Sequence, residues 1–177
     1  AKMFMNLCSM RDFNGLGELS VKDDVDYSIS QMFGDMVMLT TFDPVKNIVE
    51  DGKKWHVGTD ISKLISGSRS VTNIDAFEIM DTSKVNTMDE VFGYAQSLEN
   101  INGASNWQIG NITGSNGARR MFCQDFKLSD ISAVANWNIS GIKSLLETFC
   151  YCESLTDISP LENWGISNNA SMERVFK

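Results

Sequence analysis

Few side chains in this sequence have the type and spacing that chemistry requires. The chain holds a single histidine, His56, directly after Trp55. A histidine acts as a catalytic base only when a nucleophile and an orienting group lie within hydrogen-bond reach. The sequence places neither group beside His56, so we expect an ordinary histidine and a protein that is not an enzyme.

The four cysteines allow two interpretations. Cys123 and Cys150 are 27 residues apart at the same phase of a repeated spacing. If the repeats stack, these side chains lie roughly 5 Å apart, within reach of a disulfide. Free, buried cysteines are the alternative, because a small thiol suits tight packing between repeats. Zinc would need four thiolate or imidazole ligands, and Cys8 lies far from the others in sequence, so we expect no metal site and no cofactor.

Composition excludes two kinds of partner. A net charge of −8 and a pI near 4.6 would repel a phosphate backbone, so nucleic acid is not an expected partner. No apolar run is long enough to span a bilayer, so we expect no membrane insertion in this segment.

One spacing recurs along the whole chain and must position these groups. A bulky apolar residue, which we call the anchor, is followed by apolar residues six and nine positions later. The anchors are 27 to 32 residues apart, at Phe4, Phe33, Ile65, Phe92, Phe122, Phe149 and Phe176. The six-on residues are Met10, Leu39, Val71, Leu98, Leu128 and Leu155, and the nine-on residues are Phe13, Phe42, Ile74, Ile101, Ile131 and Ile158.

A period of this length is typical of a solenoid, in which each unit buries its apolar face against its neighbours. We predict a single α/β domain over residues 1–177, a right-handed leucine-rich-repeat solenoid with short parallel strands on one side and short helices on the other. Its six units are approximately residues 5–33, 34–65, 66–92, 93–122, 123–149 and 150–176. Both ends have the same phase and neither resembles a cap, so we expect this array to be part of a longer one.

Each unit is expected to run from a brief strand, between the six-on and nine-on residues, to a short helix before the next anchor. The segment Val85, Met88, Val91 and Phe92 has the apolar spacing of one helix face. We expect a second core column of large apolar residues fifteen positions after each anchor, which we call the fifteen-on residues. They include Ile48, Met80, Trp107 and Trp137. The asparagines that precede Trp107, Trp137 and Trp164 are expected to stack as a hydrogen-bonded ladder.

The outward positions of the expected strands form the candidate ligand face, which is small, polar and mildly acidic. It offers none of the Trp, Tyr or Arg residues that dominate protein-binding hot spots, so a solvated sheet face is the competing interpretation. The candidate residues are Asp12, Asp43, Asn73, Asp75, Asn100, Asn102, Asp130 and Asp157.

The segments NWNISGIKSLLETFCYCESLTDISPLENW and MDTSKVNTMDEVFGYAQSLENI resemble the BspA-like leucine-rich repeats. Ser68 and Ala95 depart from that pattern, because the family often has cysteine there. The resemblance implies a secreted or surface-anchored protein with a role in adhesion and protein binding.

We therefore predict a non-enzymatic cell-surface recognition or adhesion module that binds a protein or a glycan. The alternative is a structural scaffold or spacer subunit within a larger assembly, with its interface on the helical side or in the insertions.

Overall fold

The computed structural model describes residues 3–15, 20–22, 25–110, 112–113, 117–168 and 170–177. In this part of the chain the helices are short 3-10 helices and the strands form one parallel pair. The helices are η2 (Asp43–Ile48), η3 (Asp75–Ile79), η4 (Asn102–Ala104), η5 (Ser132–Asn136) and η6 (Ser159–Leu161). The strands are β1 (Trp55–His56) and β2 (Met80–Asp81), which pair in parallel. None of these helices is long and apolar enough to cross a membrane.

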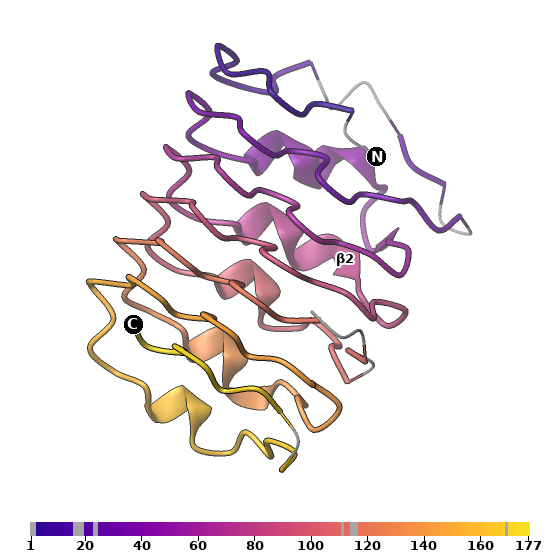
Figure 1. The fold of residues 1–177 in the computed structure, drawn as a ribbon. Coiled ribbons are helices and arrows are strands. Elements are labelled where there is room, and N and C mark those ends of the chain that lie inside the picture. The colour runs from indigo at the N-terminus through magenta and orange to yellow at the C-terminus, as the bar shows by residue number, and fades with distance from the viewer. Residues whose placement is uncertain (1–2, 16–19, 23–24, 111, 114–116, 169) are drawn as a thin grey trace.

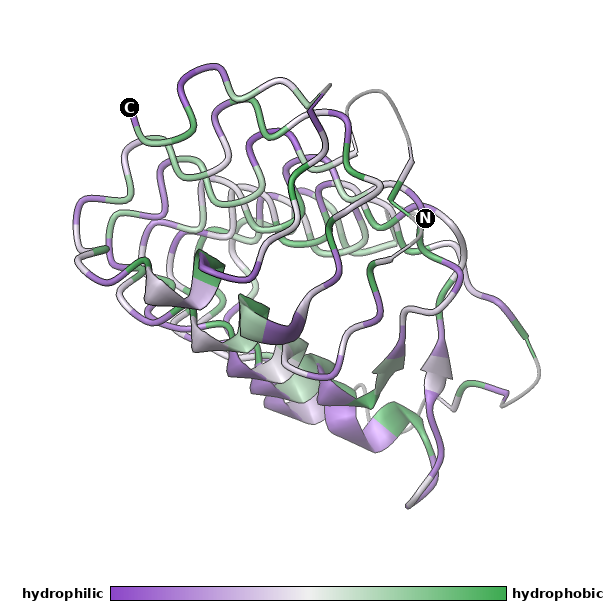
Figure 2. Cartoon of the chain, turned by 90° about the horizontal axis from the view of Figure 1, so that it is seen from below, coloured by the Kyte–Doolittle hydropathy of each residue, from purple (hydrophilic) through white to green (hydrophobic). Residues whose placement is uncertain are grey.

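The predicted leucine-rich-repeat solenoid is wrong. The described residues contain no α-helix, and their single sheet has two strands of two residues each, which does not fit six units of strand and helix. The segment from Val85 to Phe92, predicted as a helix, is irregular, with an isolated bridge at Thr87 followed by a turn and a bend. In the described residues, the strands expected between the six-on and nine-on residues are reduced to one isolated bridge, Asn100 with Asp130. What the chain forms instead is a series of irregular passes that lie side by side, with the short helices in one row (Figures 1 and 2).

Backbone conformation around the anchors explains why neither regular element forms. The residues two before and two after each interior anchor are left-handed; around Phe122 they are Arg120 (φ 52°) and Gln124 (φ 63°). A positive φ at every fourth residue is incompatible with both an α-helix and a β-strand. The same alternation occurs around the anchors Phe33, Ile65, Phe92 and Phe149.

This alternation directs backbone groups toward the neighbouring pass. We call the stretches 29–35, 61–67, 88–94, 118–124, 145–151 and 171–177 the ladder segments, and we name each pass after its anchor. In the five ladder segments before the last, alternate N–H groups donate to carbonyls of the next pass, as Phe122 does to Thr148 (2.9 Å) and Gln124 to Cys150 (2.7 Å). The buried backbone is thereby paired between passes rather than within a helix or a sheet.

The anchors form the core of the stack. Phe33, Ile65, Phe92, Phe122 and Phe149 are all at most 2% exposed. Rings of adjacent passes stack where both anchors are aromatic, with centroids 5.4 Å apart for Phe92 and Phe122 and 5.1 Å apart for Phe122 and Phe149. The predicted six-on and nine-on residues of the Phe33, Ile65, Phe92 and Phe122 passes are buried with them. In the Phe149 pass Leu155 is half-buried and Ile158 is 51% exposed.

The fifteen-on column differs from the prediction at one place. Trp55, rather than Ile48, pairs with Met80 in the parallel sheet. The residues between Ile48 and Trp55 shift the phase of this pass, so that Trp55 takes the place in the column that Trp107 and Trp137 occupy in later passes. Asn106, Asn136 and Asn163, which were predicted to form a hydrogen-bonded ladder, are exposed.

In the fifteen-on column, tryptophan side chains form hydrogen bonds between neighbouring passes. The indole N–H groups of Trp107, Trp137 and Trp164 donate to backbone carbonyls of the preceding passes, at Phe77, Ala104 and Val134 (3.0–3.2 Å). Most buried indoles have such an acceptor, but Nε1 of Trp55 is buried and has no hydrogen-bond partner in the described structure. The column therefore combines apolar burial with a specific bond to the previous 3-10 helix.

Replacing Phe122 with alanine tests the role of the anchor column. The ring is fully buried between two other rings, so we expect the free energy of unfolding to fall by about 3 to 5 kcal/mol. Chemical denaturation followed by circular dichroism measures the change. Phe176→Ala is the matched control, because Phe176 occupies the same phase but is 55% exposed, and it should cost clearly less. Equal losses for the two variants would contradict the packing described here.

Candidate functional site

The predicted ligand-face residues have a structural task. At the eight-on position, a side-chain oxygen accepts a hydrogen bond from the N–H two residues later. Asn73, Asn100, Asp130 and Asp157 do so toward Asp75, Asn102, Ser132 and Ser159, at 2.8–3.2 Å. The residues that donate are the first residues of η3, η4, η5 and η6. Short polar side chains favour such local turns, so this column starts the 3-10 helices.

Asp12 uses its side-chain oxygen in the same way, whereas Asp43, Asp75 and Asn102 take part through their backbone N–H groups. Asp12 accepts from the N–H of Asn14 (3.1 Å), and the N–H of Asp43, the first residue of η2, donates to Thr41 (3.1 Å). The hydrogen bonds from Ser159 lower the pKa of Asp157. The side-chain oxygens of five predicted residues are thus already engaged by the backbone, namely those of Asp12, Asn73, Asn100, Asp130 and Asp157. Oδ1 of Asp75, by contrast, is buried and has no hydrogen-bond partner in the described structure. The engaged positions are less suited to a ligand than the sequence indicated.

Cys123 and Cys150 form a disulfide, with an S–S distance of 2.02 Å and Cα atoms 4.7 Å apart. The bond joins the Phe122 and Phe149 passes directly beside their anchors. Cys8 and Cys152 are free thiols, and burial raises the pKa of Cys152. The described residues contain no group of three or more His, Cys, Asp or Glu side chains that could hold a metal ion.

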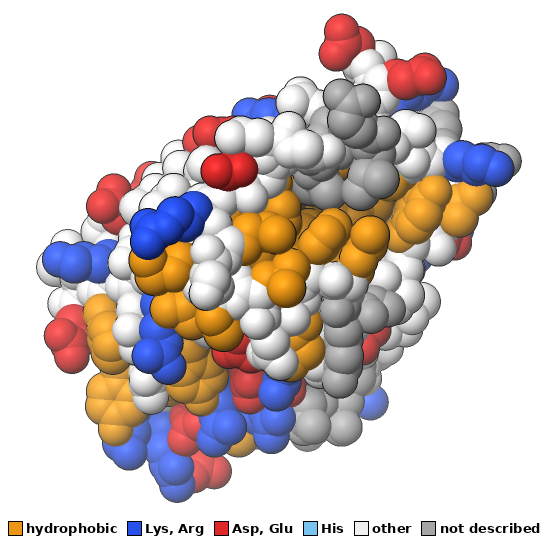
Figure 3. Space-filling model, turned by 90° about the horizontal axis from the view of Figure 1, so that it is seen from above, with side chains coloured by type: hydrophobic (Ala, Val, Ile, Leu, Met, Phe, Trp, Pro, Cys, Tyr) orange, Lys and Arg blue, Asp and Glu red, His pale blue; other side chains and the backbone are white. Residues whose placement is uncertain are grey.

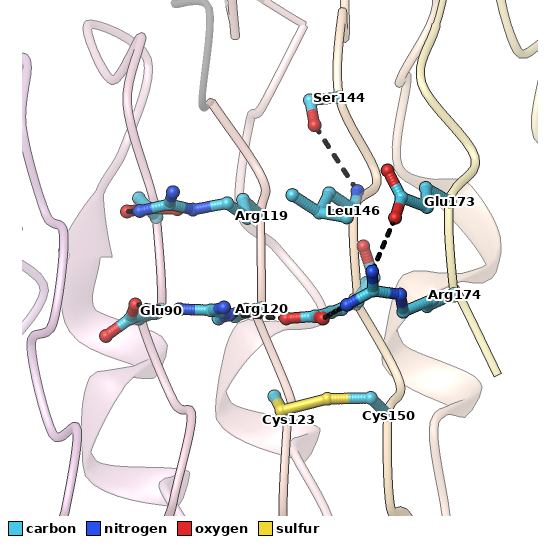
Figure 4. A network of polar contacts seen from close by, with 12 residues as sticks. Glu90, Arg119, Arg120, Cys123, Ser144, Leu146, Cys150, Glu173 and Arg174 are labelled. Carbon is cyan, nitrogen blue, oxygen red and sulfur yellow. Dashed lines mark hydrogen bonds and ion pairs between the residues drawn. A yellow bond between two sulfur atoms is a disulfide. The ribbon is translucent and has the colours of Figure 1, made fainter. Parts of the chain in front are cut away.

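Next to the disulfide runs a row of charges that the sequence analysis missed (Figure 4). The residue two before the anchor alternates in sign from pass to pass. The row consists of Lys63, Glu90, Arg120, Glu147 and Arg174. Comparing the passes in phase would have revealed it, because the signs alternate without exception over these five passes.

Each acid in this row lies between two bases. Arg120 Nε donates to Glu147 Oε2 at 2.6 Å, and Arg174 donates to Glu147 Oε1 at 3.0 Å. Glu90 contacts Lys63 at 3.2 Å and Arg120 at 3.7 Å. The Arg120 hydrogen bond is the main cause of the lowered pKa of Glu147. The three bases and two acids leave the row one positive charge, and Arg174 also contacts Glu173 outside the row at 2.9 Å. Because the charges of the row are largely paired with one another, we assign the row to holding the register of the passes rather than to binding a ligand.

A second pair reinforces this register. Arg119 holds Asp89 by two parallel bonds, Nε to Oδ1 at 3.1 Å and NH2 to Oδ2 at 2.9 Å. Such a bidentate pair is geometrically specific, which ties the Phe92 pass to the Phe122 pass.

The hollow best suited to a ligand lies on another side, over the Trp-bearing connections. It has a volume of about 580 Å³ and is lined by Lys54, Met80, Asp81, Thr82, Ser83, Asn106 and Gln108. We call this hollow the polar groove. Lys54, Asn106 and Gln108 are exposed, whereas Met80 and Thr82 are buried and form its floor.

Local bonds hold the groove in shape. Thr82 Oγ1 accepts the N–H of Gln108 at 2.7 Å, and Lys54 Nζ donates to the Glu78 carbonyl at 2.9 Å. Asp81 Oδ1 accepts the N–H of Ser83, which is the main cause of its lowered pKa, and Oδ2 lies 2.9 Å from Nδ1 of His56. The single histidine therefore lies against a carboxylate that lines the groove. Sequence reasoning placed no site here, because the groove forms only when three passes lie side by side.

Comparison with known proteins identifies the family. A model described as "Mycoplasma protein of unknown function, DUF285" matches residues 27–129 and also residues 59–177. The chain belongs to this family. Two overlapping matches to one model reflect the repeated spacing of the sequence. No curated protein and no solved structure matches the chain significantly.

Removing the charge of Glu147 tests the charged row. In Glu147→Gln the side chain keeps its size, but Arg120 and Arg174 lose their carboxylate, so we expect the free energy of unfolding at neutral pH to fall by roughly 1 kcal/mol. The pKa of Glu147 is lowered in the folded chain, so its contribution is present above the ordinary value of 4.5 and is lost as the pH falls through the lower folded value. The difference between variant and wild type should therefore vanish in acid.

Urea denaturation of both proteins across the acidic range measures this difference. Glu162→Gln serves as the control, because Glu162 is exposed and has no ion pair in the described structure. If Glu147→Gln and Glu162→Gln change stability alike at every pH, the charged row does not hold the passes in register.

Proposed function

We propose that this chain is a non-enzymatic recognition module that binds a glycan through the polar groove. The observation that carries the proposal is the convergence of side-chain amide, carboxylate and ammonium groups from neighbouring passes on one hollow. A sugar hydroxyl both donates and accepts hydrogen bonds, and the Asn106 and Gln108 amides can do both in return. We therefore propose a binding role for these groups and no catalytic step.

The location of the protein remains a proposal as well. The resemblance to BspA-like surface proteins favours an extracellular or cell-surface position. The Cys123–Cys150 disulfide supports it, since disulfides persist mainly in oxidising compartments. Glycans are abundant ligands at cell surfaces, so the proposed ligand and the proposed location are consistent with each other.

The test combines a glycan array with calorimetry on the glycans it selects. Alanine at both Asn106 and Gln108 removes two exposed amides from the groove, and we expect at least about a tenfold loss of affinity, corresponding to roughly 1.4 kcal/mol. The two side chains are exposed, so folding should be unaffected.

Asn136→Ala is the matched control for this variant. Asn136 precedes Trp137 as Asn106 precedes Trp107, and it is also exposed, but it does not line the groove. Its affinity should equal that of the wild type. A chain that binds no glycan, or that binds a protein instead through the same residues, would overturn the assignment of a glycan.

Exposed apolar side chains favour a second candidate, a scaffold or assembly subunit. Tyr151, Ile158, Met172 and Phe176 are 43–55% exposed in the last passes, where a hollow of about 220 Å³ adjoins Phe149. Met3 and Leu7 are exposed near the N-terminus. Figure 3, which views the molecule from the N-terminal end, shows apolar side chains gathered in a band across this face. Apolar surface of this kind is typical of contact sites between proteins. Analytical ultracentrifugation of the isolated chain separates the candidates, since a scaffold should associate and a glycan-binding monomer should not.

A further inference from the structure

One buried position recurs three residues after the anchor. There, a polar side chain contacts the backbone of the preceding pass, and we call this position the inner slot. In the Ile65 pass it is occupied by Ser68, whose Oγ accepts the N–H of Met36 (3.2 Å) and donates to the carbonyl of Phe33 (2.7 Å). The slot thus presents one donor and one acceptor, and Ser68 satisfies both.

Cys152 fills the slot in the same way in the Phe149 pass. Its Sγ donates to the carbonyl of Phe122 at 3.0 Å and receives a backbone hydrogen bond from Asp125. Serine and cysteine differ in size and acidity, yet each carries a hydrogen toward the anchor carbonyl. The slot therefore requires a side chain that accepts with one side and donates with the other.

Asp125 occupies the inner slot of the Phe122 pass. It is completely buried, with 0% of its surface exposed. Oδ1 accepts the N–H of Ala95 at 2.9 Å, which is the bond that Ser68 makes to Met36. Oδ2 is buried and has no hydrogen-bond partner in the described structure. A carboxylate has no hydrogen to donate, so an ionised Asp125 could not make the second bond of the slot.

The surroundings contain nothing that would stabilise a negative charge on Asp125. No cation contacts it among the described residues, and the only titratable group that faces it there is the Cys152 thiol in the next pass. The preceding pass presents Ala95. Burial without a compensating charge favours the neutral form of a carboxyl group and raises its pKa.

We infer that Asp125 is a neutral carboxylic acid in the folded chain, that its Oδ2–H donates to the carbonyl of Phe92, and that its ionisation weakens the contact between the Phe92 and Phe122 passes. Asp125 therefore links the two passes only while it is protonated, and we call this pH-dependent contact the latch. The next boundary, between the Phe122 and Phe149 passes, is held by the Cys123–Cys150 disulfide and does not depend on this proton.

The sign of the pH dependence follows from the raised pKa. Above the ordinary value of 3.8 the unfolded chain releases the proton and the folded chain keeps it, so the contribution of Asp125 to stability falls as the pH rises toward the folded pKa. Asp125→Asn removes this titration. Its amide can donate to the Phe92 carbonyl while its oxygen accepts the N–H of Ala95.

The experiment measures the unfolding equilibrium of wild type and Asp125→Asn from pH 4 to pH 8. We expect the folding equilibrium constant of the variant, relative to wild type, to rise by up to about tenfold per pH unit, which is the slope for one proton. Asp130→Asn removes one exposed charge from the same pass and is the control; it should not reproduce this slope. Parallel curves for wild type and Asp125→Asn would overturn the inference.

A second measurement does not depend on any variant folding. In ¹³C-aspartate-labelled wild-type protein, carboxyl chemical shifts report ionisation directly. We expect one aspartate to remain protonated at neutral pH and to ionise only when the pH is raised further. If every aspartate carboxyl is ionised at neutral pH, Asp125 is not a neutral donor and the latch does not exist.

Discussion

The backbone hydrogen bond between neighbouring passes is the interaction on which the rest of this structure depends. In the ladder segments before the last, alternate N–H groups donate to the next pass because residues such as Arg120 and Gln124 have positive φ. A left-handed conformation costs a residue other than glycine about 1 to 2 kcal/mol. Paired backbone and buried anchors offset that cost. The anchors, the charged row and the disulfide all lie where these bonds bring adjacent passes together.

Apolar spacing predicted the core and its columns but not the backbone that carries them. Anchors such as Phe92 and Phe122 could be found from sequence because burial depends on side-chain type and phase. The segments before these anchors were predicted as helices, because apolar spacings of three and four residues occur both on a helix face and in consecutive turns. Lys, Glu and Arg rarely adopt positive φ, so nothing in residue type signalled the left-handed positions. Trp55 replaced Ile48 in its column because the intervening residues changed the phase.

The proposed site is the polar groove and not the predicted ligand face, and the reason again lies in the backbone. Residues such as Asp130 and Asp157 were outward and polar, as predicted, but their oxygens start the 3-10 helices. The polar groove takes its walls from three passes, and its residues are unremarkable in sequence until these passes align. The charged row was detectable, because its signs alternate at one phase from Lys63 to Arg174. The neutral state of Asp125 was not, since it depends on burial and on the donor that the inner slot requires.

The central claim is that left-handed residues flank each anchor and direct the backbone toward the next pass. NMR measurement of the backbone φ angles, from HN–Hα couplings and chemical shifts of Arg120, Gln124, Glu147 and Tyr151, tests it most directly. We expect positive φ at all four residues, where the structure has values from 52° to 63°. Negative φ at these residues, as an α-helix or a β-strand requires, would contradict it.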